Sequence, residues 1–387
     1  MHTAPHVAFS SHSPSLPLTV MAAPVTVALP EVLHPHERLV RRAWSRCLAL
    51  PGLPASHGSE GLTTAARAAL DALTTSVTLR GIERHRGEAL MFHAAGLAHP
   101  ATGATVVLVA ASGTGKTTAA TRLGRELEYV SDETVCVDPQ SLAIAPYPKP
   151  LSVVTRPGEP KAQVGPDELG LLPVTQRPRM HALLTLERSP ATTVPHVTEP
   201  LPLVEALAAL VPNLSALPSL PDPLRTLVRV VDACGGVRAV RYREIDDVAA
   251  RLVDLAAAPA VPTVRTGTWT HWEPTPAEHA EPFVPPVHVR PDELPDTLVP
   301  GPWVQALENP EDPSQLLLLL PESLVVLAGI APALWGVCRE RGARSPRELT
   351  RALVALCGPV PDAERLTREC AAHLLGLGVL RPGPGRT

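Results

Sequence analysis

TVVLVAASGTGKTT, residues 105–118, decides the fold of this chain of 387 residues. Its first half is an apolar run typical of a buried strand, and its second half is a glycine-rich loop that opens a helix. In such a loop the backbone N–H groups surround phosphate oxygens, Lys116 bridges the β- and γ-phosphates, and the Thr117 hydroxyl ligates Mg²⁺. The stretch predicts a site for ATP and Mg²⁺ formed by Ser112, Gly113, Thr114, Gly115, Lys116, Thr117 and Thr118.

The alternative interpretation of this stretch is a glycine-rich turn that only caps a helix. The order of strand, loop and helix favours phosphate binding. One position departs from the pattern G-x-x-x-x-G-K-[ST], because Ala110 stands in place of its first glycine. If that position required a positive φ, alanine would strain the turn and lower the affinity for nucleotide.

Composition excludes several classes of protein. Apolar residues make up 45% of the chain and charged residues 19%, close to globular averages, and no apolar run is long enough to span a bilayer. A net charge of −4 lacks the basic excess that binding to nucleic acid or to an anionic membrane requires. The six cysteines lie far apart without a CxxC pair, which favours a reducing cytoplasm over a disulfide framework.

Length and pattern divide the chain into five predicted segments. Residues 1–22 are expected to be a disordered leader, 23–75 a small N-terminal lobe without visible chemistry, and 76–257 an α/β P-loop domain. Ten prolines in 258–300 predict a semi-rigid linker. Residues 301–382 are expected to form a compact domain with a β-hairpin and three helices.

Hydrophobic periodicity places the expected elements. Strands are expected at Val25–Leu29, Ser76–Gly81, Glu88–Ala94, Thr105–Ala110, Tyr129–Val137, Leu142–Ala145, Ala182–Glu187, Ala239–Tyr242, Gln315–Leu320 and Leu324–Leu327. Helices are expected at Glu37–Leu50, Leu62–Leu73, Gly115–Leu127, Leu203–Val211, Leu224–Asp232, Ile245–Ala257, Ala331–Arg341, Pro346–Leu356 and Asp362–Leu377. Ser345 and Glu348 form a capping-box pattern, which fixes one of these helix starts.

Three acidic or basic groups are candidates for chemistry beside the loop. Asp132 and Glu133 follow Lys116 by about fifteen residues, and a phosphoryl-transfer site needs one carboxylate for Mg²⁺ and one to accept a proton. The alternative is a polar β-turn. His93 lies on the strand before the loop strand, where a carboxylate could hold it, although a single histidine on a strand is more often structural.

Only three lysines occur in the chain, so each is informative. Lys149 lies in the rigid segment PYPKP, residues 146–150, and either contacts phosphate or belongs to a surface loop. Lys161, together with Arg156, belongs either to a mobile lid or, the favoured interpretation, to an ordinary surface loop.

His93, the loop, the acidic pair and YPKPLSV together resemble the HPr kinase/phosphorylase-like proteins over residues 80–255, most strongly over 91–152. In that family the first of two adjacent acids is the base that activates a seryl hydroxyl, the second helps to hold Mg²⁺, and the histidine supports the base. The resemblance therefore implies these roles for Asp132, Glu133 and His93, with Lys116 on the phosphates. The family has Asp-Asp, so Glu133 is a departure, and only the kinase direction is implied.

Residues 310–381 resemble a PqqD-type peptide-recognition domain, through LLLLLPESLVVL, then APALWGVC with Trp335, then the capped helix. Such domains are small winged-helix-like folds that bind a leader peptide by adding a strand to a sheet edge. The alternative is a winged-helix module with a purely structural role.

The two resemblances together imply a kinase that phosphorylates Ser or Thr on a peptide or protein, with a ribosomally made precursor captured by the C-terminal domain. Two alternatives stay open. One is a non-catalytic ATP-binding partner that delivers a precursor to other enzymes, and the other is a kinase for a small hydroxylated metabolite. The sequence leaves a homo-oligomer open.

Overall fold

The computed structural model describes residues 14–49, 62–155, 158, 160–259, 270–274, 285–309, 312, 314–342 and 344–383. Contacts divide the chain into two compact units. The first comprises Met1–Leu201, Asn213–Ala216 and Ala233–Thr263, and the second Pro202–Pro212, Leu217–Asp232 and Val264–Thr387. The residues described include no helix long and apolar enough to cross a membrane.

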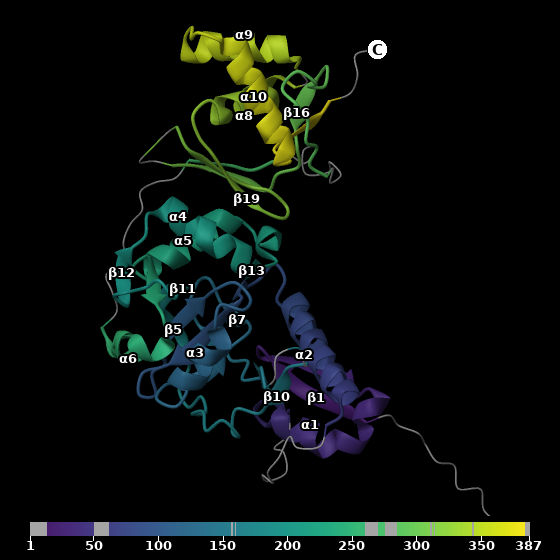
Figure 1. The fold of residues 1–387 in the computed structure, drawn as a ribbon, viewed down its shortest axis with the longest axis vertical. Coiled ribbons are helices and arrows are strands. Elements are labelled where there is room, and N and C mark those ends of the chain that lie inside the picture. The colour runs from purple at the N-terminus through teal and green to yellow at the C-terminus, as the bar shows by residue number, and fades with distance from the viewer. Residues whose placement is uncertain are drawn as a thin grey trace, which may run out of the picture. The chain divides into compact units, whose positions relative to one another are not determined.

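A six-stranded sheet forms the centre of the first unit (Figure 1). Its strands run β12, β14, β11, β5, β4, β6, of which β14, β11 and β5 are mutually parallel and the pairs of β4 and β12 are antiparallel. Both faces of β5 are buried, which explains its unbroken apolar run. The α/β class with parallel central strands is confirmed. The bounds are β4 Ala94–Ala98, β5 Ala104–Val109, β6 Glu128–Ser131, β11 Arg179–Arg188, β12 His196–Pro200 and β14 Val237–Tyr242.

Two helices pack against this sheet in one hydrophobic cluster, α3 (Lys116–Leu123) and α6 (Ala249–Ala257), with the short η5 (Ile245–Asp247) before α6. The predicted helix through Leu127 ends earlier, because Gly124 weakens the helix and its carbonyl accepts a bond from the Leu172 N–H. The predicted helix at Ile245–Ala257 likewise begins as η5.

A second sheet, in the order β13, β3, β7, β8, explains where the acidic pair lies. The predicted strand Tyr129–Val137 is in fact two strands in two sheets, since β6 ends at Ser131 and β7 begins at Val135. The Ser131 hydroxyl accepts bonds from the N–H groups of Glu133 and Thr134, which stabilises the turn between them. The bounds are β3 Leu90–Phe92, β7 Val135–Val137, β8 Ile144–Ala145 and β13 Leu214–Ser215.

The N-terminal part corrects two predictions. Residues 1–22 are not all disordered leader, because β1 (Ser15–Val20) pairs with β2 (Ala23–Ala28), while 1–13 lie outside the described residues. The predicted strand Ser76–Gly81 is the end of a helix, α2 (Thr64–Arg84). The alternation in SVTLRG suggested a strand, but the buried residues Leu70, Leu73, Val77 and Gly81 recur at helical spacing.

Gly81 lets α2 approach the hairpin closely, since a Cβ there would lie 2.6 Å from a Val20 methyl. The predicted boundary at residue 75 therefore falls inside one helix. The remaining elements of this unit are η1 Glu31–His36, α1 Glu37–Ala43, η2 Ser45–Cys47, β9 Leu151–Val153 and β10 Ala162–Val164.

The second unit holds the predicted hairpin and three helices, together with a four-stranded antiparallel sheet in the order β15, β17, β18, β19 (Figure 1). The Ser345 capping box is present, with the hydroxyl accepting from the Glu348 N–H. The bounds are β15 His271–Trp272, β16 Leu298–Pro300, β17 Gln305–Glu308, β18 Leu316–Leu319, β19 Leu324–Leu327, α8 Ala331–Arg341, α9 Pro346–Cys357, α10 Ala363–Gly376 and β20 Leu380–Pro382.

Two helices predicted in the P-loop domain, α4 (Leu203–Leu210) and α5 (Pro223–Ala233), fall almost wholly in the second unit. The buried Gln305 explains part of this grouping, because its carbonyl accepts from the Leu224 N–H at 2.7 Å and its amide donates to Asp222. Short 3₁₀ turns η3 (Val211–Asn213) and η4 (Leu217–Ser219) flank β13.

The predicted linker 258–300 is wrong for its described parts. β15 joins the four-stranded sheet, and β16 pairs with β20. Leu298 is fully buried, and Trp272 packs against the same core, so apolar anchors hold this proline-rich stretch to the unit. Residues 260–269 and 275–284 lie outside the described residues.

Candidate active site

The glycine-rich loop lies between β5 and α3, as predicted. Gly113 and Gly115 have φ of 84° and 110°, and Gly115 is the residue that caps the start of α3. Both conformations are left-handed and favour glycine. Ala110 is not among the residues with a positive φ, so alanine fits this position without backbone strain. The departure from the motif therefore does not distort the loop.

Lys116 folds back over the loop. Its Nζ donates to the carbonyl oxygens of Ala110 at 2.5 Å and Ala111 at 3.1 Å, and only 6% of the residue is exposed. Burial and the charge of Lys161 lower the pKa of Lys116, while Glu133 and Asp132 oppose the shift. Since these partners are neutral carbonyls, the charge of the ammonium is available for phosphate oxygens.

Asp132 follows β6, and both of its carboxylate oxygens have partners. Oδ2 accepts from the Thr117 hydroxyl at 2.9 Å. Oδ1 accepts from the Tyr129 phenol at 2.9 Å and lies 3.0 Å from Lys149 Nζ. Its side chain is 1% exposed. The carboxylate thus links the loop threonine to a buried cation.

Lys149 fits neither interpretation left open by the sequence. It is fully buried, so it does not belong to a surface loop, and its ammonium faces carboxylates and the Pro150 carbonyl at 2.9 Å. The second carboxylate, Glu133 Oε2, lies 3.6 Å away. Burial lowers the pKa of Lys149, but Asp132 and Glu133 outweigh it and hold the pKa above its ordinary value. The rarity of lysine in this chain was the signal that could have identified it.

Glu133 and His93 lie together, and both are partly exposed. The Glu133 side chain is 34% exposed, and its Oε1 is 3.5 Å from His93 Nδ1. The same ring nitrogen is 3.0 Å from the Glu133 carbonyl oxygen. The pKa of His93 is lowered, chiefly by burial and then by the charge of Lys116. The charges of Glu133 and Asp132 act in the opposite direction but do not outweigh these effects. The predicted neighbourhood of histidine and carboxylate is present.

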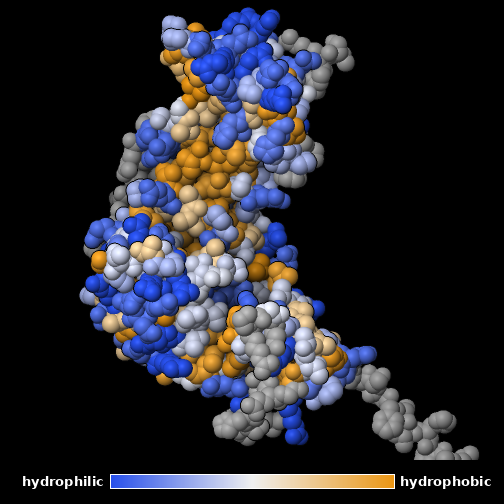
Figure 2. All heavy atoms as spheres, in the orientation of Figure 1, coloured by the Kyte–Doolittle hydropathy of each residue, from blue (hydrophilic) through white to orange (hydrophobic). Residues whose placement is uncertain are grey.

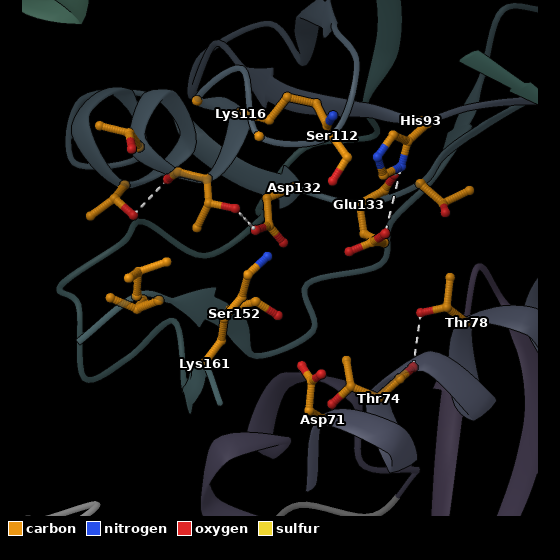
Figure 3. A pocket seen from close by; sticks show the side chains of 18 of the residues that line it. Asp71, Thr74, Thr78, His93, Ser112, Lys116, Asp132, Glu133, Ser152 and Lys161 are labelled. Carbon is orange, nitrogen blue, oxygen red and sulfur yellow. Dashed lines mark hydrogen bonds and ion pairs between the residues drawn. The ribbon is translucent and has the colours of Figure 1, made fainter. Parts of the chain in front are cut away.

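One cavity of about 870 Å³ is lined by Lys116, Asp132, Glu133 and His93, whereas the buried Lys149 does not line it. Figure 3 shows Lys116 and Ser112 on one side, Asp132 and Glu133 in the middle, and α2 on the other side. The loop residue Thr114 does not line it. The predicted residues that do are His93, Ser112, Gly113, Gly115, Lys116, Thr117, Thr118, Asp132 and Glu133.

The sequence missed the wall opposite the loop. It is a hydroxyl-bearing face of α2 that includes Asp71, Thr74, Thr75 and Thr78 (Figure 3). The N-terminal lobe, expected to carry no chemistry, therefore supplies part of the cavity. Lys161 also lines it, whereas Arg156 lies outside the described residues.

The residues present fit Mg²⁺. This ion binds through one or two carboxylates, substrate phosphates and water, and does not need a cage made only of protein. The Thr117 hydroxyl and the Asp132 carboxylate are already in contact. The described residues contain no group of three or more His, Cys, Asp and Glu side chains that could hold a metal by itself.

Comparison with known proteins gives one match. No model of a known family matches the chain, and no curated protein does. Among solved structures, the chain is similar to the Hpr(Ser) kinase/phosphatase from Coxiella burnetii, with 13% identity over 43% of this chain and 97% of that chain, at a TM-score of 0.23. Because a TM-score this low carries no weight, the fold rests on the strand order and the loop geometry of this chain.

Proposed function

We propose that the chain is an ATP-dependent kinase that transfers the γ-phosphate to a Ser or Thr hydroxyl of a peptide or protein. The observation that carries this proposal is the meeting of Lys116, Thr117 and two carboxylates in one cavity. Phosphoryl transfer requires phosphate positioning, charge neutralisation and a proton acceptor, and these groups supply each.

The chain's own residues have separate tasks in this reaction. Loop N–H groups and Lys116 bind the phosphates and orient the γ-phosphate toward the carboxylates. Thr117 with the neighbouring acids would hold Mg²⁺, which supplies positive charge for the phosphate oxygens when bound. The α2 wall leaves room on the other side of the cavity for the acceptor.

A peptide acceptor is favoured by the second unit. β19 is at one end of its sheet and pairs with β18 alone among the described residues, which leaves a strand edge of the kind that PqqD-type domains use for leader peptides. Figure 2 shows hydrophobic residues gathered in this unit, and Val326 of β19 is exposed, whereas β18 is buried. We therefore propose a ribosomally made precursor as substrate, in the cytoplasm.

Adjacent prolines on β19 test the capture of a peptide. Along an antiparallel strand the N–H groups alternate in direction, so one of Val325→Pro and Val326→Pro removes a bond to β18 and the other removes an outward N–H. The variant that removes the outward N–H should keep the wild-type melting temperature. On a peptide that the wild type phosphorylates, it should raise KM about tenfold and leave kcat unchanged.

The same assay separates the alternatives. A metabolite kinase predicts unchanged KM in both variants that fold, and a non-catalytic carrier predicts no phosphorylated product from the wild type. Full-length variants are needed, because a chain ending near Pro259 would remove Gln305, the partner of α5.

A further inference from the structure

Asp132 is poorly placed to take a proton from an acceptor hydroxyl. Both of its oxygens have partners, with Thr117 on Oδ2 and Tyr129 and Lys149 on Oδ1. A general base must come within hydrogen-bond distance of the proton it removes. Asp132 borders the cavity, but with 1% of its side chain exposed it offers an acceptor hydroxyl little access to its oxygens.

Moving Asp132 would also leave the charge of Lys149 badly compensated. The ammonium is fully buried, and its other carboxylate, on Glu133, lies further away at 3.6 Å than Asp132 does at 3.0 Å. Removing one partner of a buried ion pair leaves an uncompensated charge, which is strongly unfavourable. Lys149 thus holds Asp132 in place beside Thr117.

Glu133 has the opposite surroundings. A third of its side chain is exposed, it lines the cavity, and its Oε2 lies 3.6 Å from the buried lysine. Figure 3 shows it on the same side as His93. It can therefore meet an acceptor hydroxyl while Asp132 stays in place.

We propose that Glu133 is the catalytic base and that Asp132, fixed by Lys149, is the carboxylate on the metal side, the reverse of the roles implied by resemblance. The inference rests on the proposed kinase function. In the transfer step the hydroxyl oxygen forms a bond to the γ-phosphorus, and its proton passes to a Glu133 carboxylate oxygen. The bond from the γ-phosphorus to its bridging oxygen breaks, and ADP leaves with the electron pair.

Glu133→Gln and Asp132→Asn form a matched pair of isosteric variants. Two readouts separate the roles: release of phosphate from ATP with water as acceptor, and Mn²⁺ affinity in the presence of ADP by electron paramagnetic resonance. Glu133→Gln should lower the rate by about 10²–10⁴-fold and leave Mn²⁺ affinity within about twofold. Asp132→Asn should weaken Mn²⁺ binding by about tenfold or more, since a charged ligand becomes neutral.

Thr117→Ala is a second test of the metal side in case Asp132→Asn does not fold. It leaves the partners of Lys149 unchanged and should also weaken Mn²⁺ binding. The inference is overturned if Glu133→Gln keeps the wild-type rate, or if neither Asp132→Asn nor Thr117→Ala changes Mn²⁺ affinity. If the wild type releases no more phosphate than Lys116→Ala and phosphorylates no peptide, the proposed function fails together with the inference. The two failures are thereby distinguished.

Discussion

Lys149→Met should lower the free energy of unfolding by about 3–5 kcal/mol, because it leaves two adjacent carboxylates without their buried cation. The lysine is fully buried and lies 3.0 Å from Asp132. Methionine retains most of the apolar stem, so the loss reports the charge more than the packing. Urea denaturation of wild type and variant measures the difference.

Lys161→Met is the matched control, since Lys161 lines the same cavity but is exposed, and its replacement should change stability by less than about 0.5 kcal/mol. The double variant Lys149→Met with Asp132→Asn should recover much of the loss, because the amide no longer needs a cation. Equal stability of Lys149→Met and wild type would show that the ion pair contributes nothing.

Lys116→Ala should weaken ATP binding by about 100-fold or more. Among the described residues its ammonium bonds to two loop carbonyls, and charged hydrogen bonds to phosphates contribute about 1.5–3 kcal/mol each. Isothermal titration with Mg-ATP measures the affinity.

Lys116→Met is the control for packing, because the residue is only 6% exposed and alanine removes its stem as well as its charge. Both variants should lose ATP binding alike, while Lys116→Met keeps more of the wild-type stability. Unchanged ATP affinity in both would remove the phosphate-binding assignment of the loop.

Local signals in the sequence were enough to predict the loop and most of the C-terminal elements. The run from Thr105 to Thr118 specifies strand, turn and helix through composition alone. Likewise, Ser345 and Glu348 fix the start of α9. These features depend on neighbours within a few residues, which is the range that periodicity and capping describe.

What could not be predicted depends on distant contacts. Lys149 meets Asp132 only because the chain returns past β6 after β8, and no spacing rule encodes that approach. The sequence at the end of α2 alternates like a strand. Its helical conformation depends on packing against the β1–β2 hairpin beside Gly81. Gln305 joins α5 to the second unit across about eighty residues of sequence. Tertiary packing decides such cases over local preference.

The proposed reaction of this chain is transfer of the γ-phosphate of ATP to a peptide hydroxyl. The most direct measurement is mass spectrometry of a pooled library of synthetic Ser- and Thr-containing peptides after incubation with Mg-ATP and the full-length chain. The gain of one phosphoryl group on a subset of peptides, absent with Lys116→Ala, is the predicted result. Peptides that stay unmodified with a wild-type chain that binds ATP would contradict the account.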